Sequence, residues 1–233
     1  HLNERLESRP RPHRETETIR PDAPADASYV PAGIELRNPT CCRPASGDQL
    51  LKAPQVYREL IHRLPQETRF FIDNSNSVPW SIHYFFHPRP ESYHLSIEFA
   101  TMAWAVGAAV GGAFASQSAP SVCIAGDGCY LMSSQEITVA VERQLPVIFA
   151  VLNDRAYGLI RHGHRIAGTE KVEYAIPPVD FAQMARAAGA EAHTIKCAAD
   201  FDRIDWQALA LRQGPTLLDV AIDPEEPPPL AMA

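Results

Sequence analysis

The sequence predicts an α/β protein with a doubly wound parallel sheet and helices on both faces. Apolar strand-like runs alternate with helix-like segments over most of the chain. The run at 146–152 is apolar almost throughout, which is typical of a strand covered on both sides. Another run, 121–125, leads directly into Gly126-Asp127-Gly128, and such turns lie at the edge where parallel sheets bind ligands.

The first part of the chain has a different composition. Residues 1–49 are charged, weakly apolar and repeatedly interrupted by proline. This composition is typical of a linker or extended arm, which we expect to be the end of a preceding central domain. We therefore predict an arm at 1–49, one domain at 50–223 and a polar tail at 224–233.

The helices and strands of the domain are predicted from the spacing of apolar residues and from residues that begin or end helices. Val56, Leu60, Ile61 and Leu64 recur at helical spacing. Asp180 is a predicted N-cap for a helix over 181–188, and Gly189 is its predicted stop. Helices are also predicted at 100–115, at 133–143 and, capped by Asp200, at 200–212; strands are predicted at 69–73, 121–125, 146–152, 192–195 and 216–222.

Composition excludes several classes of function. The net charge of −7 offers no basic surface for nucleic acid or anionic lipid. No apolar run reaches the roughly 18 residues that a membrane span needs. The five cysteines show no CxxC spacing, so we expect a reducing, cytoplasmic setting. Neither a nucleic-acid partner nor a membrane is therefore predicted.

Two acidic residues follow neighbouring predicted strands. Asp127 lies between two glycines, and Asp154 comes 27 positions later, after the run at 146–152. Two carboxylates at this edge suit Mg²⁺ or Ca²⁺, which in turn can hold a diphosphate, with a backbone carbonyl near Ala156 as a third ligand. A lone Gly-Asp-Gly is usually only a turn. Its place between a strand and a helix, with a second acidic strand end nearby, favours the metal site.

A set of short motifs resembles the signature of thiamine diphosphate-dependent enzymes. It comprises Gly126-Asp127-Gly128, Met132, Gln135-Glu136, Pro146 and Leu152-Asn153-Asp154. The match is strongest to the acetolactate synthase and 2-oxo-acid decarboxylase group and runs from about Leu51 to Ala221. The resemblance implies the domain that binds the diphosphate of the cofactor.

The resemblance also implies the residues of the site. The Mg²⁺ (or Ca²⁺) ligands would be the side chains of Asp127 and Asp154 and the carbonyl of Ala156, and Asp154 departs from the usual asparagine. The residues implied to bind the cofactor are Asn76, Ser77, Ala100, Met102, Gly126, Asp127, Gly128, Cys129, Asp154, Ala156, Tyr157 and Gly158.

Met102 would be the apolar wedge that bends the cofactor into a V shape, although filling the core is the usual role of a methionine. Leu159, Ile160 and Gly163 would border the substrate pocket. Gly163 stands where true acetohydroxyacid synthases have a tryptophan that selects the acceptor, which suggests a roomier pocket. The neighbouring His162 and His164 are interpreted as part of a surface loop that borders the substrate pocket; the alternatives are metal ligands or substrate-binding cations.

The implied reaction is decarboxylation of a 2-oxo acid such as pyruvate, followed by ligation of the resulting enamine to a second carbonyl. The alternatives are a non-ligating decarboxylase and a non-catalytic cofactor-binding or regulatory subunit. The family's activating glutamate belongs to a separate pyrimidine-binding domain that nothing here resembles. We therefore expect a companion chain or N-terminal fragment to supply it, and a homodimer or tetramer of the complete enzyme. FAD would involve another domain and cannot be read from this sequence.

Overall fold

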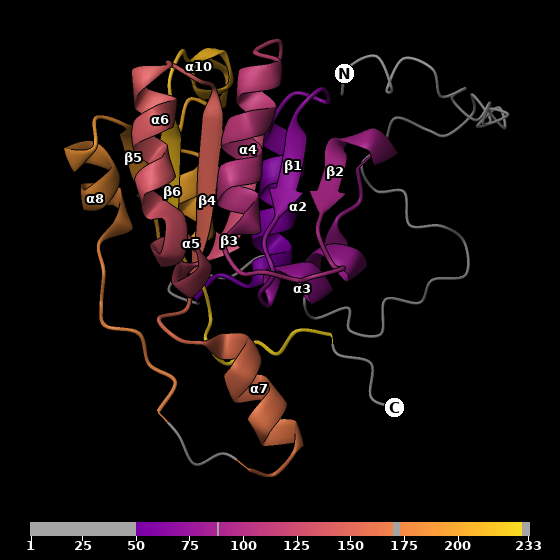
Figure 1. Cartoon of the computed structure of the whole chain (residues 1–233). Helices are drawn as coiled ribbons and strands as arrows, with labels where there is room; N and C mark the ends of the chain where they lie inside the picture. Colours follow the sequence, from indigo (N-terminus) through magenta and orange to yellow (C-terminus); the bar gives the residue numbers. More distant parts are fainter. Residues whose placement is uncertain (1–49, 88, 170–172, 230–233) are drawn as a thin grey trace, which may run out of the picture.

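The computed structural model describes residues 50–87, 89–169 and 173–229. The predicted arm at 1–49 and the last residues of the predicted tail, 230–233, lie outside the described residues. The described part confirms the predicted α/β class, with a parallel sheet between helices (Figure 1).

The sheet has six strands in the order β2-β1-β3-β4-β6-β5, and every neighbouring pair is parallel. Their bounds are β1 Arg69–Ile72, β2 Tyr93–Leu95, β3 Ser121–Gly126, β4 Val147–Asn153, β5 Glu191–Ile195 and β6 Thr216–Ala221. Gly126 is the register partner of Leu152 on β4. Because the strands are parallel, the residues that follow β1, β3 and β4 meet at one edge.

Each face of the sheet has its own hydrophobic core. Along β4, Ile148, Ala150 and Leu152 face one core, whereas Val147 and the other alternate residues face the second. The first core is covered by α2 (Ala53–Arg63), α3 (Ser77–Tyr84), α9 (Ala198–Phe201) and α10 (Trp206–Leu211). The second is covered by α4 (Trp104–Ala115), α5 (Asp127–Ser133), α6 (Ile137–Glu142) and α8 (Phe181–Ala187). Double burial explains the apolar run of β4.

Helix caps confirm one predicted helix and correct another. The Asp180 carboxylate accepts a hydrogen bond from the Gln183 N–H at 2.7 Å and begins α8, as expected. The single helix predicted at 200–212 is wrong, because it consists of α9 and α10. Asp200 lies inside α9 and accepts from the N–H of Lys196. The cap of α10 is Asp205, which accepts from the Ala208 N–H at 2.9 Å.

Three further boundaries differ from the prediction at the ligand edge. The helix predicted at 133–143 begins earlier, as α5 at Asp127, and continues through a 3₁₀ turn into α6. The helix predicted at 100–115 begins only at Trp104. The surface loop proposed around His162 and His164 is instead helix α7 (Gly158–Ile166), and His162 is buried in it.

Helix α7 projects from the ligand edge of the sheet, away from both helical layers (Figure 1). The chain that follows β6 is tied to it. Arg161 donates to the carbonyl of Pro224, and Arg165 pairs with Glu225 at 2.6 Å. Among the described residues, no helix is long and apolar enough to span a membrane.

Candidate cofactor site

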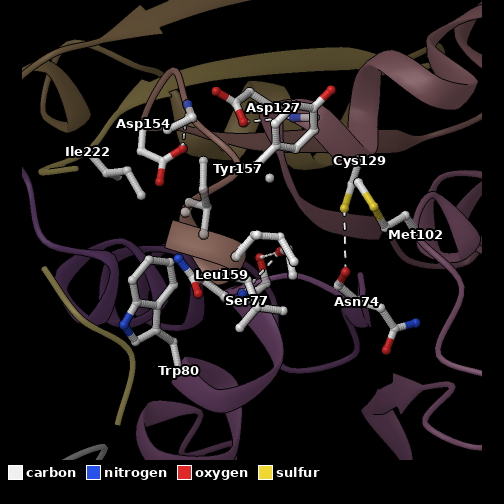
Figure 2. A pocket seen from close by; sticks show the side chains of 18 of the residues that line it. Asn74, Ser77, Trp80, Met102, Asp127, Cys129, Asp154, Tyr157, Leu159 and Ile222 are labelled. Atoms are coloured by element: carbon white, nitrogen blue, oxygen red, sulfur yellow. Dashed lines mark hydrogen bonds between the residues drawn. The ribbon is translucent and has the colours of Figure 1, made fainter. Parts of the chain in front are cut away.

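A cavity of about 240 Å³ opens where β1, β3 and β4 end (Figure 2). Every residue that the sequence implied as cofactor-binding lines this cavity. Leu159 and Ile160 line it as well. Gly163 does not: it lies farther along α7, and a Cβ built there meets nothing within 4 Å. The sequence reasoning did not identify Asn74, Ser75, Trp80, Leu152 and Ile222, which also line the cavity.

Asp127 brings a buried carboxylate to this cavity. It is the first residue of α5, and only 2% of its surface is exposed. Its Oδ1 accepts a hydrogen bond from the Gly128 N–H at 2.7 Å. Its Oδ2 is buried and has no hydrogen-bond partner among the described residues. An unsatisfied buried carboxylate oxygen is costly in an isolated protein, so this atom indicates a place for a cation.

Asp154 stands on a turn that neighbouring backbone holds in place. Its Oδ1 accepts a hydrogen bond from the Ala156 N–H at 3.2 Å. Arg155 has a positive φ of 56°, which few non-glycine residues adopt. The turn is fixed to residues 174–176 by two further bonds, from the Tyr157 N–H to the Tyr174 carbonyl and from the Ile176 N–H to the Arg155 carbonyl.

The two carboxylates repel each other in a dry environment. Burial, with the nearby charge of Asp154, raises the pKa of Asp127 to about 7, although the backbone N–H groups of Gly128, Arg155 and Ala156 act in the opposite direction. Burial also raises the pKa of Asp154 to about 6, although the Ala156 N–H and the Arg161 guanidinium act in the opposite direction. A divalent cation between the two oxygens would remove both penalties. The carboxylates therefore fit Mg²⁺ or Ca²⁺, which prefer oxygen ligands.

The rest of a metal shell would come from elsewhere. In the three described segments of the chain, no group of three histidine, cysteine, aspartate or glutamate side chains converges on a metal position. A backbone carbonyl such as that of Ala156, with oxygens from a diphosphate and from water, would have to complete the coordination. The site therefore fits a metal together with its anionic ligand better than a metal alone.

These pKa values predict how pH acts on the metal-free chain. Both folded-state values lie above the ordinary aspartate value of about 4, so the folded state binds these protons more tightly than the unfolded state. Their contribution to stability is complete below about pH 4 and is lost as pH rises through about 7. Urea unfolding without metal should therefore show lower stability at pH 8 than at pH 5.5.

The control for this pH effect is the double variant Asp127→Asn, Asp154→Asn, in which neither group titrates. Its stability should change distinctly less between pH 5.5 and 8 than that of the wild type. Equal changes in the two proteins would contradict the assignment of the pH effect to this carboxylate pair.

Gly158 allows three elements to meet at the site. A Cβ at this first residue of α7 would overlap Asp154 Oδ2 and would lie 2.7 Å from Asn76 Nδ2. The Oδ1 of Asn76 is buried and, among the described residues, has no hydrogen-bond partner. The ends of β1 and β4 and the start of α7 are therefore packed against one another around potential ligand-binding atoms.

Met102 reaches the cavity from the turn before α4, and Cys129 lines the same cavity (Figure 2). Met102 is 37% exposed, so the alternative that it fills the core is wrong. Cys129 and Gly128 lie in the first turn of α5, where helix N–H groups have no backbone partner within the helix. Such N–H groups are suited to the oxygens of an anion. The Gly128 N–H donates to the Asp127 carboxylate.

The fold and the cavity together define an α/β cofactor-binding domain whose site lies at the carboxyl ends of parallel strands. The family model "Thiamine pyrophosphate enzyme, C-terminal TPP binding domain" matches residues 73–220. The chain belongs to this family, and its cofactor is thiamine diphosphate.

Curated relatives and solved structures agree with this family. IlvB2 of Mycobacterium tuberculosis, named as an acetolactate synthase large subunit, is 32% identical over 179 residues. The acetolactate synthase isozyme 2 large subunit of Escherichia coli is 29% identical over 178 residues. These alignments cover 72% and 73% of this chain but only 31% of each relative. The chain therefore spans about a third of the length of these relatives.

A crystal structure of benzoylformate decarboxylase from Polynucleobacter necessarius superposes with a TM-score of 0.68 at 22% identity, over 80% of this chain and 36% of that one. A 4-hydroxybenzoylformate decarboxylase from Rhodococcus jostii gives a TM-score of 0.70 at 21% identity, over 78% of this chain and 34% of that one. At these identities the structures establish a shared fold.

Proposed function

We propose that this chain is the diphosphate-binding part of an enzyme that decarboxylates a 2-oxo acid such as pyruvate and ligates the product to a second carbonyl compound, as an acetolactate synthase does. The observation that carries the proposal is the unsatisfied Oδ2 of Asp127, buried in a cavity that Asp154 and Met102 also line. The relatives named as acetolactate synthases favour the ligating reaction over other uses of the cofactor.

The residues of the cavity have separate tasks in this proposal. Asp127, Asp154 and the Ala156 carbonyl would hold Mg²⁺ (or Ca²⁺). The N–H groups of Gly128 and Cys129 would donate to phosphate oxygens, and for Gly128 this N–H would be shared with Asp127 Oδ1. Asn76 and Ser77 would add polar contacts. Met102 would be the apolar wedge that favours the bent form of the cofactor, and Ala100 would offer its carbonyl to the aminopyrimidine. When bound, the cofactor supplies the electron sink that decarboxylation of a 2-oxo acid requires.

The proposed enzyme also needs a pyrimidine-binding domain with a glutamate. Two large apolar side chains that line the cavity, those of Tyr157 and Ile160, are about half exposed. Exposed apolar side chains gathered at one place often mark a surface that another domain covers. We assign this surface to the pyrimidine-binding domain of a companion chain or of an N-terminal fragment, within a homodimer or tetramer of the complete enzyme.

One observation favours a second candidate, a non-ligating 2-oxo-acid decarboxylase. Gly163 contributes no side chain, and it does not line the cavity. The chain therefore lacks, at this position, the tryptophan implied to select an acceptor. A third possibility, a non-catalytic subunit, is disfavoured because Asp127, Asp154 and Met102 all line the same cavity.

Two measurements on the full chain with its companion domain test the proposal. Calorimetry should detect binding of thiamine diphosphate that depends on Mg²⁺, and absence of binding would refute the proposed function. With pyruvate as substrate, acetolactate or acetoin is the expected product. Free acetaldehyde as the sole product would instead establish the decarboxylase.

A further inference from the structure

The turn that carries Met102 has an unfavourable backbone conformation. Ala100 and Ala103, on either side of it, have positive φ angles of 52° and 69°. For residues with a Cβ this left-handed conformation is disfavoured, and it persists only where surrounding contacts impose it. The side chain of Met102 is itself 37% exposed, so its own packing is not what holds the turn.

The contacts that impose this conformation come from the end of β1. Asp73 Oδ1 accepts a hydrogen bond from the Ala103 N–H, and Oδ2 accepts one from the Ala105 N–H, both at 2.8 Å. Asn74 Nδ2 donates to the Thr101 carbonyl at 2.9 Å. One strand end therefore binds the turn on both sides of Met102.

Burying the carboxylate of Asp73 costs free energy unless hydrogen bonds compensate for the lost water. Its exposed fraction is 0%, and burial raises the pKa of its carboxyl, while the Cys129 side chain and the backbone N–H groups of Ala105 and Ala103 lower it. It does not line the cavity, whereas Met102 does. Because Ala103 precedes α4 and Ala105 lies in its first turn, the one carboxylate joins the turn to the start of the helix through two charge-assisted hydrogen bonds.

We propose that Asp73 is a positioning residue for the cofactor site: its carboxylate, with the amide of Asn74, holds residues 100–103 so that Met102 projects into the cavity. The expected effect of Asp73 on thiamine diphosphate binding rests on the proposed function. The structural part of the proposal, the position of Met102, concerns the chain without cofactor and can be tested separately.

The first test follows the methyl group of Met102 in the cofactor-free full chain. The sequence has four methionines, so ¹³C-methyl labelling of methionine gives a simple NMR spectrum, and Met102→Leu assigns the signal. In Asp73→Asn one oxygen acceptor becomes an amide donor that faces an N–H group. The Met102 signal should shift or broaden, while those of Met132 and Met184 should stay in place.

The control for a general loss of stability is Asp205→Ala. Asp205 caps α10 through the Ala208 N–H and is exposed, so it accepts a helix N–H as Asp73 does but does not contact the turn. This variant should lose stability without moving the Met102 signal. An unchanged Met102 signal in folded Asp73→Asn would overturn the proposal. If Asp73→Asn does not fold, the test uses Asn74→Ala, which removes only the bond to Thr101. This variant should shift the Met102 signal in the same way, and an unchanged signal would overturn the proposal.

The second test measures binding with Mg²⁺ and the companion domain present. Asp73→Asn should weaken thiamine diphosphate binding at least tenfold, and Met102→Ala in the Asp73→Asn background should add little to the loss, because both changes act through the same side chain. Fully additive losses would show that Asp73 acts by another route and would overturn its positioning role. If the wild type itself fails to bind, the proposed function is wrong, and the Met102 signal still decides whether Asp73 holds the turn.

Discussion

Asp127→Asn is expected to weaken the binding of thiamine diphosphate with Mg²⁺ at least a hundredfold while making the metal-free chain more stable at pH 8. The variant keeps an oxygen near the Gly128 N–H but removes the charge that would hold the metal. In the wild type that charge is buried beside Asp154, and the raised pKa of Asp127, about 7, measures the resulting penalty. Removing it should stabilise the metal-free fold by about 1–3 kcal/mol.

The opposite signs of the two effects distinguish a functional carboxylate from a structural one. Calorimetry in the presence of Mg²⁺ and the companion domain measures the first effect, and urea unfolding without metal measures the second. Asp205→Asn is the matched control, because Asp205 is an exposed helix cap outside the cavity. It should leave affinity and stability nearly unchanged. A loss of stability in Asp127→Asn, with binding intact, would exclude Asp127 as a metal ligand.

Gly158→Ala should reduce binding by at least tenfold and destabilise the chain by about 1–3 kcal/mol, since overpacking forces neighbouring groups to move. The added methyl group would overlap Asp154 Oδ2 and crowd Asn76 Nδ2. One of these groups must shift, or the start of α7 must move away from the sheet. In each case the geometry around the proposed metal position changes, and calorimetry should record the loss.

Gly163→Ala supplies the matched control on the same helix. A Cβ at this position meets nothing within 4 Å, so the substitution should stabilise α7 by roughly 0.5–1 kcal/mol through helix propensity alone. Its affinity for thiamine diphosphate should equal that of the wild type. If Gly158→Ala also gained stability and kept its affinity, the contact of α7 with Asp154 would have no role in the site.

The candidate site was more predictable than its surroundings. The motif from Gly126 to Asp154 lies on consecutive strands, and the positions implied as cofactor-binding all line one cavity. Gly163, which the resemblance placed in the substrate pocket, does not line it. Helix boundaries were harder, because they depend on local competition for hydrogen bonds. Asp200 was expected to begin a long helix, but its carboxylate accepts from Lys196 N–H, and Asp205 begins α10 instead.

Other features had no signal in the sequence pattern. Strand β2 has only three residues, too few to show a periodic pattern. Helix α7 was not predicted, because its two histidines and its internal glycine suggested a loop. The sequence did not indicate that Trp80 lines the cavity, because a buried tryptophan usually belongs only to a hydrophobic core. In the structure Trp80 packs in the core and also lines the cavity. These assignments depend on which segments pack together, and periodicity within one segment does not contain that information.

By itself, the sequence determined the α/β class, the family and the order of the ligand-binding turns, because alternating elements and short motifs are properties of neighbouring residues. Only the tertiary structure decided the strand order, the unsatisfied oxygen of Asp127 and the support of the Met102 turn by Asp73. Asp73 and Ala103 are 30 positions apart and meet only when β1 is placed beside α4. Burial and hydrogen bonding between distant segments arise from folding, and that is why they could not be read from the chain.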